Sequence, residues 1–187
     1  MRRIGALALV LLLLGAPASA GALSHRLLVN GDSLAVGTKP YLPKALRGWQ
    51  VTQSASVSRH ASDGADVLRS YGRALPRVIH VSLGTNDDPN QVSVFRAAVR
   101  EVMDVAGSRR CVVWTNIVRP PAAGASYAGF NRALAAESRL RDNLRIVNWV
   151  RMVHAHPEWL SSDGVHVSAE GYQARAKAIA RSVRRCH

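Results

Sequence analysis

The chain lacks most of the features that mark membrane, repeat and multidomain proteins. After residue 20 it has no apolar run near the roughly 20 residues that a membrane-spanning helix needs, so we expect no membrane span in the mature chain. Residues 25–186 contain no internal repeat, low-complexity tract or linker. With 187 residues, the chain fits one domain, since domains commonly hold roughly 100 to 200 residues.

Acidic residues are also scarce, with 12 of them against 25 lysines and arginines, which gives a formal net charge of +13. The basic residues are scattered, with pairs such as Arg109-Arg110 and Arg184-Arg185 but no run of five or more. We therefore expect no specific nucleic-acid partner. The charge favours solubility and an association with anionic surfaces, and a role in selecting an acidic substrate stays open.

The first twenty residues resemble a secretory signal peptide. Arg2 and Arg3 precede an apolar run from Ile4 to Leu14, and residues 18–20 are the small residues that a signal peptidase accepts. We expect cleavage after Ala20 and a secreted, extracellular protein that comprises residues 21–187. A retained N-terminal anchor is the alternative.

The chain has only two cysteines, Cys111 and Cys186. An oxidising compartment lets such a pair persist as a disulfide, which here would tie the C-terminus to the predicted sheet. Two separate thiols are the alternative, because the sequence does not give the distance between the Cα atoms. His154 and His156 have no cysteine or carboxylate cluster near them in the sequence, so we expect no metal site.

Short apolar runs alternate with amphipathic segments along the chain. Residues 92–106 have a helical spacing that ends at Gly107, and a second helix is predicted from the N-cap Ser168 to Val183. Residues 65–71 and 127–140 are weaker helix candidates. The runs predicted to be buried strands are Arg26–Asn30, Trp49–Ala55, Val78–Leu83, Cys111–Ile117 and Leu144–Val150. This alternation predicts a doubly wound α/β fold with a five-stranded parallel sheet.

Polar residues follow the first, third and fifth predicted strands. Gly31-Asp32-Ser33-Leu34 presents a serine at a turn into a helix, and Gly84-Thr85-Asn86-Asp87 presents an asparagine amide. In Asp163-Gly164-Val165-His166, three residues separate a carboxylate from an imidazole, so one turn can join them. Ligands bind beyond the carboxyl ends of the strands in such sheets, so these segments are candidates for one site.

Together the three segments resemble the first, third and fifth signature blocks of the SGNH/GDSL hydrolase superfamily. The resemblance spans nearly all of residues 21–187 and implies a three-layer α/β/α, flavodoxin-like sandwich. It also implies hydrolysis of carboxylic esters or thioesters without a metal or organic cofactor. The implied roles are Ser33 as nucleophile, His166 as general base and then acid, and Asp163 as the group that orients His166. Asn86 and the Ser33 amide would form the oxyanion hole.

The chain departs from the family pattern after its second predicted strand. The family has a glycine there whose backbone N–H is a further oxyanion donor, whereas this chain reads Ser56-Val57-Ser58-Arg59-His60. Ser58 or Arg59 is the expected equivalent, and either has a backbone N–H to donate. Which of them serves as the third donor stays open.

The sequence therefore predicts a secreted serine esterase, whose substrate is a small-molecule, lipid or glycan ester. One alternative is an acyltransferase or deacetylase that acts on cell-wall or extracellular glycan with the same triad. Another is a basic surface-binding protein that keeps the fold without catalysis. Among the tryptophans, Trp114 and Trp149 are expected in buried strands, whereas Trp159 either lines the pocket or braces its loop.

Overall fold

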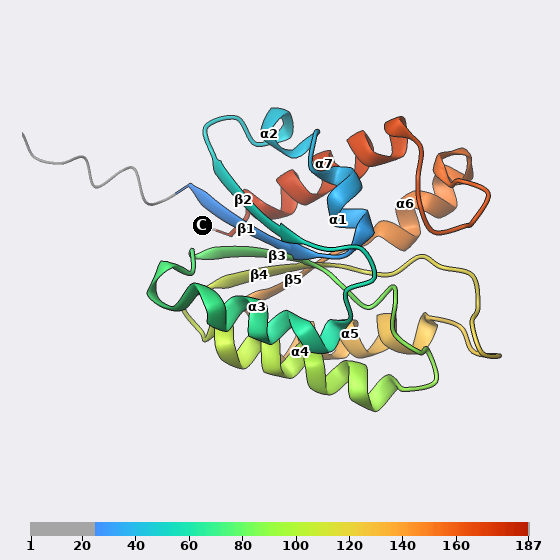
Figure 1. The fold of residues 1–187 in the computed structure, drawn as a ribbon, viewed down its shortest axis with the longest axis horizontal. Helices are drawn as coiled ribbons and strands as arrows, with labels where there is room; N and C mark the ends of the chain where they lie inside the picture. Colours follow the sequence, from blue (N-terminus) through green and yellow to red (C-terminus); the bar gives the residue numbers. More distant parts are fainter. Residues whose placement is uncertain (1–24, 187) are drawn as a thin grey trace, which may run out of the picture.

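A computed structural model describes residues 25–186, so the predicted signal peptide lies outside the described residues. The described chain forms one all-parallel sheet in the order β2-β1-β3-β4-β5 (Figure 1). In β1, Leu27 pairs with Val51 of β2 on one side and with Val78 of β3 on the other. The strands are β1 (Arg26–Gly31), β2 (Gln50–Ala55), β3 (Val78–Ser82), β4 (Cys111–Thr115) and β5 (Leu144–Val147).

Helices cover both faces of this sheet, as the predicted three-layer α/β/α architecture requires (Figure 1). One face carries α3 (Gly64–Tyr71), α4 (Val92–Ala106) and α5 (Ala128–Leu140); the other carries α1 (Ser33–Thr38), α2 (Leu42–Ala45) and α7 (Ala169–Val183). Buried residues form one apolar cluster under each layer, because strands covered on both faces bury the side chains of both faces.

Most of the predicted helices and strands are confirmed, and two helices begin or end at the capping residues expected from the sequence. Gly107 ends α4 at a φ of 67°, in the left-handed region that favours glycine. Ser168 caps α7 by accepting a hydrogen bond from the backbone N–H of Gly171. Trp114 lies buried in β4, as expected.

The prediction that Trp149 lies in a strand is wrong. β5 ends at Val147, and the side chain of Asn148 accepts a hydrogen bond from the backbone N–H of Arg151, which caps a helix. That helix, α6 (Trp149–Ala155), was not predicted. A continuous apolar run does not tell a buried strand from a buried helix, so the cap decided the boundary.

Cys111, the first residue of β4, forms a disulfide with Cys186, just beyond α7, and their Cα atoms are 5.7 Å apart. The predicted bond is therefore present. It lies at the amino end of the sheet, opposite the carboxyl ends that carry the polar segments. None of the helices in the described part of the chain is both long enough and apolar enough to cross a membrane.

Candidate active site

The three polar segments meet where the strand order changes direction. β1 and β3 are neighbours in the sheet, but their following chains leave toward opposite faces, α1 on one and α4 on the other. This divergence opens a crevice at the carboxyl ends of the two strands. Ser33 follows β1 and Asn86 follows β3, so both residues lie at this crevice.

Ser33 is the first residue of α1 and is held in place by the residues before it. Oδ1 of Asp32 accepts a hydrogen bond from the backbone N–H of Leu34 at 3.0 Å, which caps the helix. A Cβ on Gly31 would collide with Ala35, so only glycine lets α1 turn back this tightly from β1. The backbone N–H of Ser33 has no hydrogen-bond partner among the described residues.

Asp163 and His166 lie in a compact loop before α7. Oδ1 of Asp163 accepts hydrogen bonds from the backbone N–H groups of Val165 and His166, at 2.9 and 3.0 Å. Gly164 has a φ of 66°, and a Cβ there would lie 2.7 Å from Pro120. The loop is closed at its base by the hydrogen bond from Ser161 N–H to the carbonyl of His166. The aspartate side chain therefore organises the loop that carries the imidazole.

The imidazole of His166 joins the two other predicted residues. Its Nδ1 lies 2.6 Å from Oδ2 of Asp163, and its Nε2 lies 2.9 Å from Oγ of Ser33. With the proton on Nδ1, His166 donates to Asp163 and can accept from the serine hydroxyl. The side chains of His166 and Asp163 are 43% and 49% exposed, so the site is open to solvent.

The hydrogen bond from His166, together with the backbone N–H of Val165, holds the pKa of Asp163 at about 2. The carboxylate is therefore ionised at neutral pH. An ionised Asp163 favours the tautomer of His166 in which Nε2 is free to accept a proton.

Of the other predicted oxyanion residues, Asn86 lies at the same cavity as Ser33 and His166, and Arg59 contacts Asn86. Asn86 is half-buried, and its Nδ2 donates one hydrogen bond to the carbonyl of Arg59 at 3.2 Å. The backbone N–H of Arg59 donates to the carbonyl of Ser56 at 3.3 Å, whereas that of Ser58 has no partner among the described residues. Ser58 has a φ of 62°, a backbone conformation that favours glycine, near the position where the family pattern has one.

Solved structures of GDSL-like and O-acetyltransferase proteins share this architecture. The chain superimposes on a GDSL-like lipase from Bacteroides thetaiotaomicron with a TM-score of 0.71 at 14% identity, over 92% of this chain and 93% of that one. The C-terminal catalytic domain of peptidoglycan O-acetyltransferase A (OatA) from Streptococcus pneumoniae, solved with a methylsulfonyl adduct, gives a TM-score of 0.68 at 20% identity, over 88% and 93% of the two chains. The chain has the SGNH/GDSL hydrolase fold.

The amino-acid sequence of the chain is similar to that of an O-acetyltransferase. The chain is 24% identical over 161 residues to O-acetyltransferase OatA of Staphylococcus aureus, an alignment that covers 83% of the chain. The same alignment covers 24% of the relative, so the chain spans about a quarter of the length of the curated relatives it matches. No profile of a known protein family matches the chain.

A cavity of about 350 Å³ lies in front of Ser33. Ser33, Asn86, Asp163, Val165 and His166 line it, together with a wall of four residues after β4: Arg119, Pro120, Pro121 and Ala122. The wall is not among the predicted site residues. The prolines at 120 and 121 were its only signal in the sequence, and the fold brings them to the same cavity as Ser33.

Asn131 of α5 fixes the start of this wall. Its side chain accepts from the backbone N–H of Ile117 and donates to the carbonyl of the same residue, both at 2.8 Å. Arg119 donates to the carbonyl of Thr85 and lies over the ring of Tyr127 at 5.9 Å. The wall is therefore tied both to α5 and to the segment that presents Asn86.

A buried polar group lies beneath Ser33. Arg175 of α7 is 2% exposed, donates to Oγ of Ser82 at 2.9 Å and lies over the ring of Trp149 at 5.1 Å. Burial lowers the pKa of Arg175 to about 10, so its guanidinium remains charged at neutral pH. Burial also raises the pKa of Asp32, and the charge of Arg175 opposes that rise. Arg175 thus supports the carboxylate that caps α1.

Trp159 and Asp87 have structural contacts outside the triad. Trp159 is buried, and its ring stacks on those of Trp149 at 5.8 Å and His156 at 4.2 Å, so it braces the loop and does not line the cavity in front of Ser33. Asp87 accepts hydrogen bonds from the backbone N–H of Ala61 and so ties two loops together. Within residues 25–186, no cluster of three or more histidine, cysteine or acidic side chains could hold a metal ion.

Proposed function

We propose that this protein is a secreted serine hydrolase that cleaves carboxylic esters through an acyl-enzyme on Ser33. The observation that carries the proposal is the series of hydrogen-bonding distances from Ser33 to His166 to Asp163. A serine hydroxyl is a poor nucleophile near neutral pH and needs a base within hydrogen-bond reach. Nε2 of His166, 2.9 Å from the serine oxygen, meets that requirement.

In the first step, His166 takes the proton of Ser33 while Oγ bonds to the carbonyl carbon of the ester. The carbonyl oxygen becomes negative and accepts hydrogen bonds from the Ser33 N–H and the Asn86 amide. We assign the third donor to the N–H of Ser58, because that of Arg59 already donates to Ser56. His166 then protonates the leaving alkoxide, the ester C–O bond breaks, and the acyl group stays on Ser33.

In the second step, an acceptor hydroxyl releases the acyl group. His166 takes a proton from water, the resulting hydroxide oxygen bonds to the acyl carbon, and Ser33 leaves with its proton restored. Asp163 stays ionised throughout, because its pKa of about 2 is far below the working range. This mechanism uses no metal and no organic cofactor.

A second candidate differs only in the acceptor: a sugar hydroxyl takes the acyl group in place of water. The similarity to OatA of Staphylococcus aureus and to the pneumococcal OatA catalytic domain supports this candidate. The exposed triad also leaves room for a polymer. A deacetylase acting on glycan esters would use the same residues in the hydrolytic direction.

Substitution of the triad tests the proposal. Ser33→Ala should lower kcat for p-nitrophenyl acetate by at least about 10⁴-fold, and Asp163→Asn should lower it by roughly 10³- to 10⁴-fold because the imidazole tautomer is lost. Ser162→Ala, an exposed serine of the same loop, is the matched control and should leave kcat unchanged. Full activity in Ser33→Ala would refute the assignment.

Product analysis separates the two acceptors. The protein is incubated with p-nitrophenyl acetate in the presence of N-acetylglucosamine oligomers, and the sugars are examined by mass spectrometry. Hydrolysis yields free acetate alone, whereas transfer yields acetylated sugar that is absent with Ser33→Ala. Labelling of Ser33 by a fluorophosphonate argues against the third alternative, a non-catalytic surface-binding protein.

We also propose that residues 21–187 act outside the cell as one domain. The Cys111–Cys186 disulfide supports this location, because disulfides persist in oxidising compartments. The ester substrate is the partner that the open site accommodates, and the excess of basic residues favours association with anionic surfaces.

A further inference from the structure

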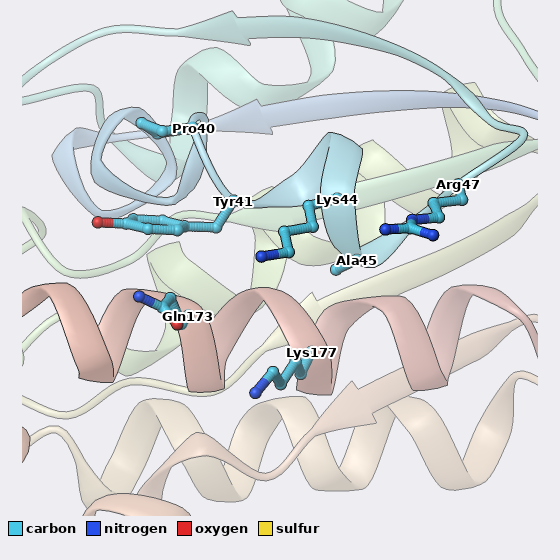
Figure 2. Close-up of a pocket in the computed structure, with 7 residues that line it drawn as sticks. All are labelled: Pro40, Tyr41, Lys44, Ala45, Arg47, Gln173 and Lys177. Atoms are coloured by element: carbon cyan, nitrogen blue, oxygen red, sulfur yellow. The ribbon is translucent and has the colours of Figure 1, made fainter.

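A second cavity lies between α2 and α7 and shares no lining residue with the one in front of Ser33. Its volume is about 520 Å³, within the range of small-molecule binding sites. Figure 2 shows Tyr41, Lys44 and Arg47 on one side of the cavity, and Gln173 and Lys177 of α7 across from them. The proposed ester chemistry uses none of these residues.

Three cations line this cavity, and no carboxylate does. Lys44, Arg47 and Lys177 are exposed, and none of them has an ion pair or hydrogen bond to another described residue. Like charges that converge on one cavity repel one another, at a cost that falls when an anion binds among them. The charge of the lining therefore favours an anionic ligand over a neutral one.

Two other groups of arginines in the described chain are paired with carboxylates. Arg96, Arg100 and Arg141 converge on the buried carboxylate of Glu137, at 2.6 to 2.9 Å. Arg69 bridges Asp66 and Glu101, at 2.6 Å from each. The lining of the cavity between α2 and α7 includes no such carboxylate.

The rest of the lining suits a sugar ring. Pro40, Ala45 and the half-buried ring of Tyr41 supply non-polar surface, and the amide of Gln173 can both donate and accept a hydrogen bond. Sugars present C–H faces and hydroxyl groups together, so they match a lining of this mixed character. A nucleic-acid surface would instead carry its cations in a stripe.

We propose that this cavity binds an anionic saccharide unit, one that carries a phosphate or a carboxylate group. The three cations contact the anionic group, and Tyr41 with Gln173 contacts the ring and its hydroxyls. The inference does not depend on Ser33 or on the ester chemistry.

Calorimetric and NMR titrations of the whole protein test this site. The probes are glucose 6-phosphate, glucuronic acid, glucose, inorganic phosphate and a single-stranded oligo-dT. Glucose 6-phosphate or glucuronic acid should bind at least tenfold more tightly than glucose and inorganic phosphate, and should shift the backbone amides of residues 41–47 and 173–177. Which of the two binds identifies the anionic group. Binding should weaken as salt is raised.

Matched charge variants localise the binding. The triple variant Lys44→Gln, Arg47→Gln and Lys177→Gln should lose affinity by at least tenfold. Its control removes three exposed arginines outside the cavity with the same change of charge: Arg109→Gln, Arg132→Gln and Arg151→Gln. The control should stay within twofold of the unchanged protein. Circular dichroism and p-nitrophenyl acetate turnover should be the same for both, because the catalytic cavity is untouched.

Three results would overturn the proposal. Equal losses in the two triple variants would show general charge attraction. Tight binding of oligo-dT without binding of the anionic sugars would show a nucleic-acid surface. Absence of saturable binding by either anionic sugar would show that the cavity does not take this class of ligand.

Discussion

Asn86 has two amide hydrogens and uses one of them inside the protein. Its Nδ2 donates to the carbonyl of Arg59, which fixes the amide against the loop after β2 and leaves a second N–H for the cavity. The side chain therefore has a structural partner as well as its proposed oxyanion role. Any test of the role must separate the two.

Asn86→Ala should lower kcat for p-nitrophenyl acetate by about 10²- to 10³-fold with a small change in KM, since an oxyanion donor acts mainly in the transition state. Asn86→Asp should be slower still, because a carboxylate repels the developing oxyanion. If Asn86 only held the loop, the falls in kcat would be accompanied by matching losses of stability in urea unfolding. Asn90→Ala, an exposed asparagine of the same segment, is the control and should change kcat by less than about threefold.

At the scale of the element, α1 matters because it carries Ser33 and packs closely on α7. A Cβ on Gly37 would collide with the ring of Tyr172, the side chain that faces α1 from the first turn of α7. The position of the serine therefore depends on a small residue in one helix and an aromatic residue in another. The sequence offers no sign that these two residues are partners.

Gly37→Ala should destabilise the fold by about 1 to 3 kcal/mol, the usual cost of an overpacked contact, and should lower kcat because α1 is displaced. Tyr172→Leu added to Gly37→Ala should recover part of both losses, since the smaller side chain makes room for the new methyl group. Urea unfolding and nitrophenyl ester turnover of the two single variants and the double variant measure the coupling. Purely additive effects would show that the contact does not position α1.

At the scale of the whole molecule, the disulfide and the site lie at opposite ends of the sheet. Cys111 begins β4, whereas the cavity in front of Ser33 lies beyond the carboxyl ends of the strands. The bond joins residues separated by 75 positions, so it removes much conformational freedom from the unfolded chain. Removal of the disulfide should therefore lower the stability of the fold and leave kcat unchanged.

Cys111→Ser combined with Cys186→Ser should lower the free energy of unfolding by about 2 to 4 kcal/mol. The kcat at 25 °C should stay within about twofold of the unchanged protein, because the fold around Ser33 does not contact the bond. Urea unfolding curves and nitrophenyl ester assays measure the two quantities. A large fall in kcat at a temperature where the variant is folded would contradict this separation.

His80 couples the stability of the whole fold to pH. It lies buried in β3, and burial, with a further contribution from the charge of Arg175, lowers its pKa to about 3. In the unfolded chain the pKa is about 6.5. Between these values the unfolded state binds a proton that the folded state does not, so the free energy of unfolding falls as the pH drops from about 6.5 to about 3.

His80→Gln removes the titratable imidazole. It keeps a polar group near Thr115, the hydrogen-bond partner of His80 at 2.9 Å. Between pH 7 and pH 4.5, the variant should lose about 2 kcal/mol less stability than the unchanged protein, as measured by urea unfolding at both pH values. His154→Gln, which removes an exposed histidine, is the matched control for the substitution. Parallel stability curves for the protein and His80→Gln would refute the coupling.

The sequence by itself determined the alternation of strands and helices and the three segments of the candidate site. Those features are local: apolar periodicity and caps act over a few residues, and Asp163 reaches His166 within one turn. The end of β5 and the start of α6 were less predictable, because one apolar run can form a strand or a helix. Here the side chain of Asn148 caps the helix and sets the boundary.

Contacts between residues far apart in the sequence depend on the tertiary structure. Ser33 and His166 are 133 positions apart, and their contact exists because α1 and α7 pack on the same face of the sheet. The wall from Arg119 to Ala122, the buried Arg175 beneath Ser33 and the three cations between α2 and α7 have no local signal for the same reason. Their environments are made by segments far apart in the chain, and the energy of such contacts depends on the packing of the whole fold.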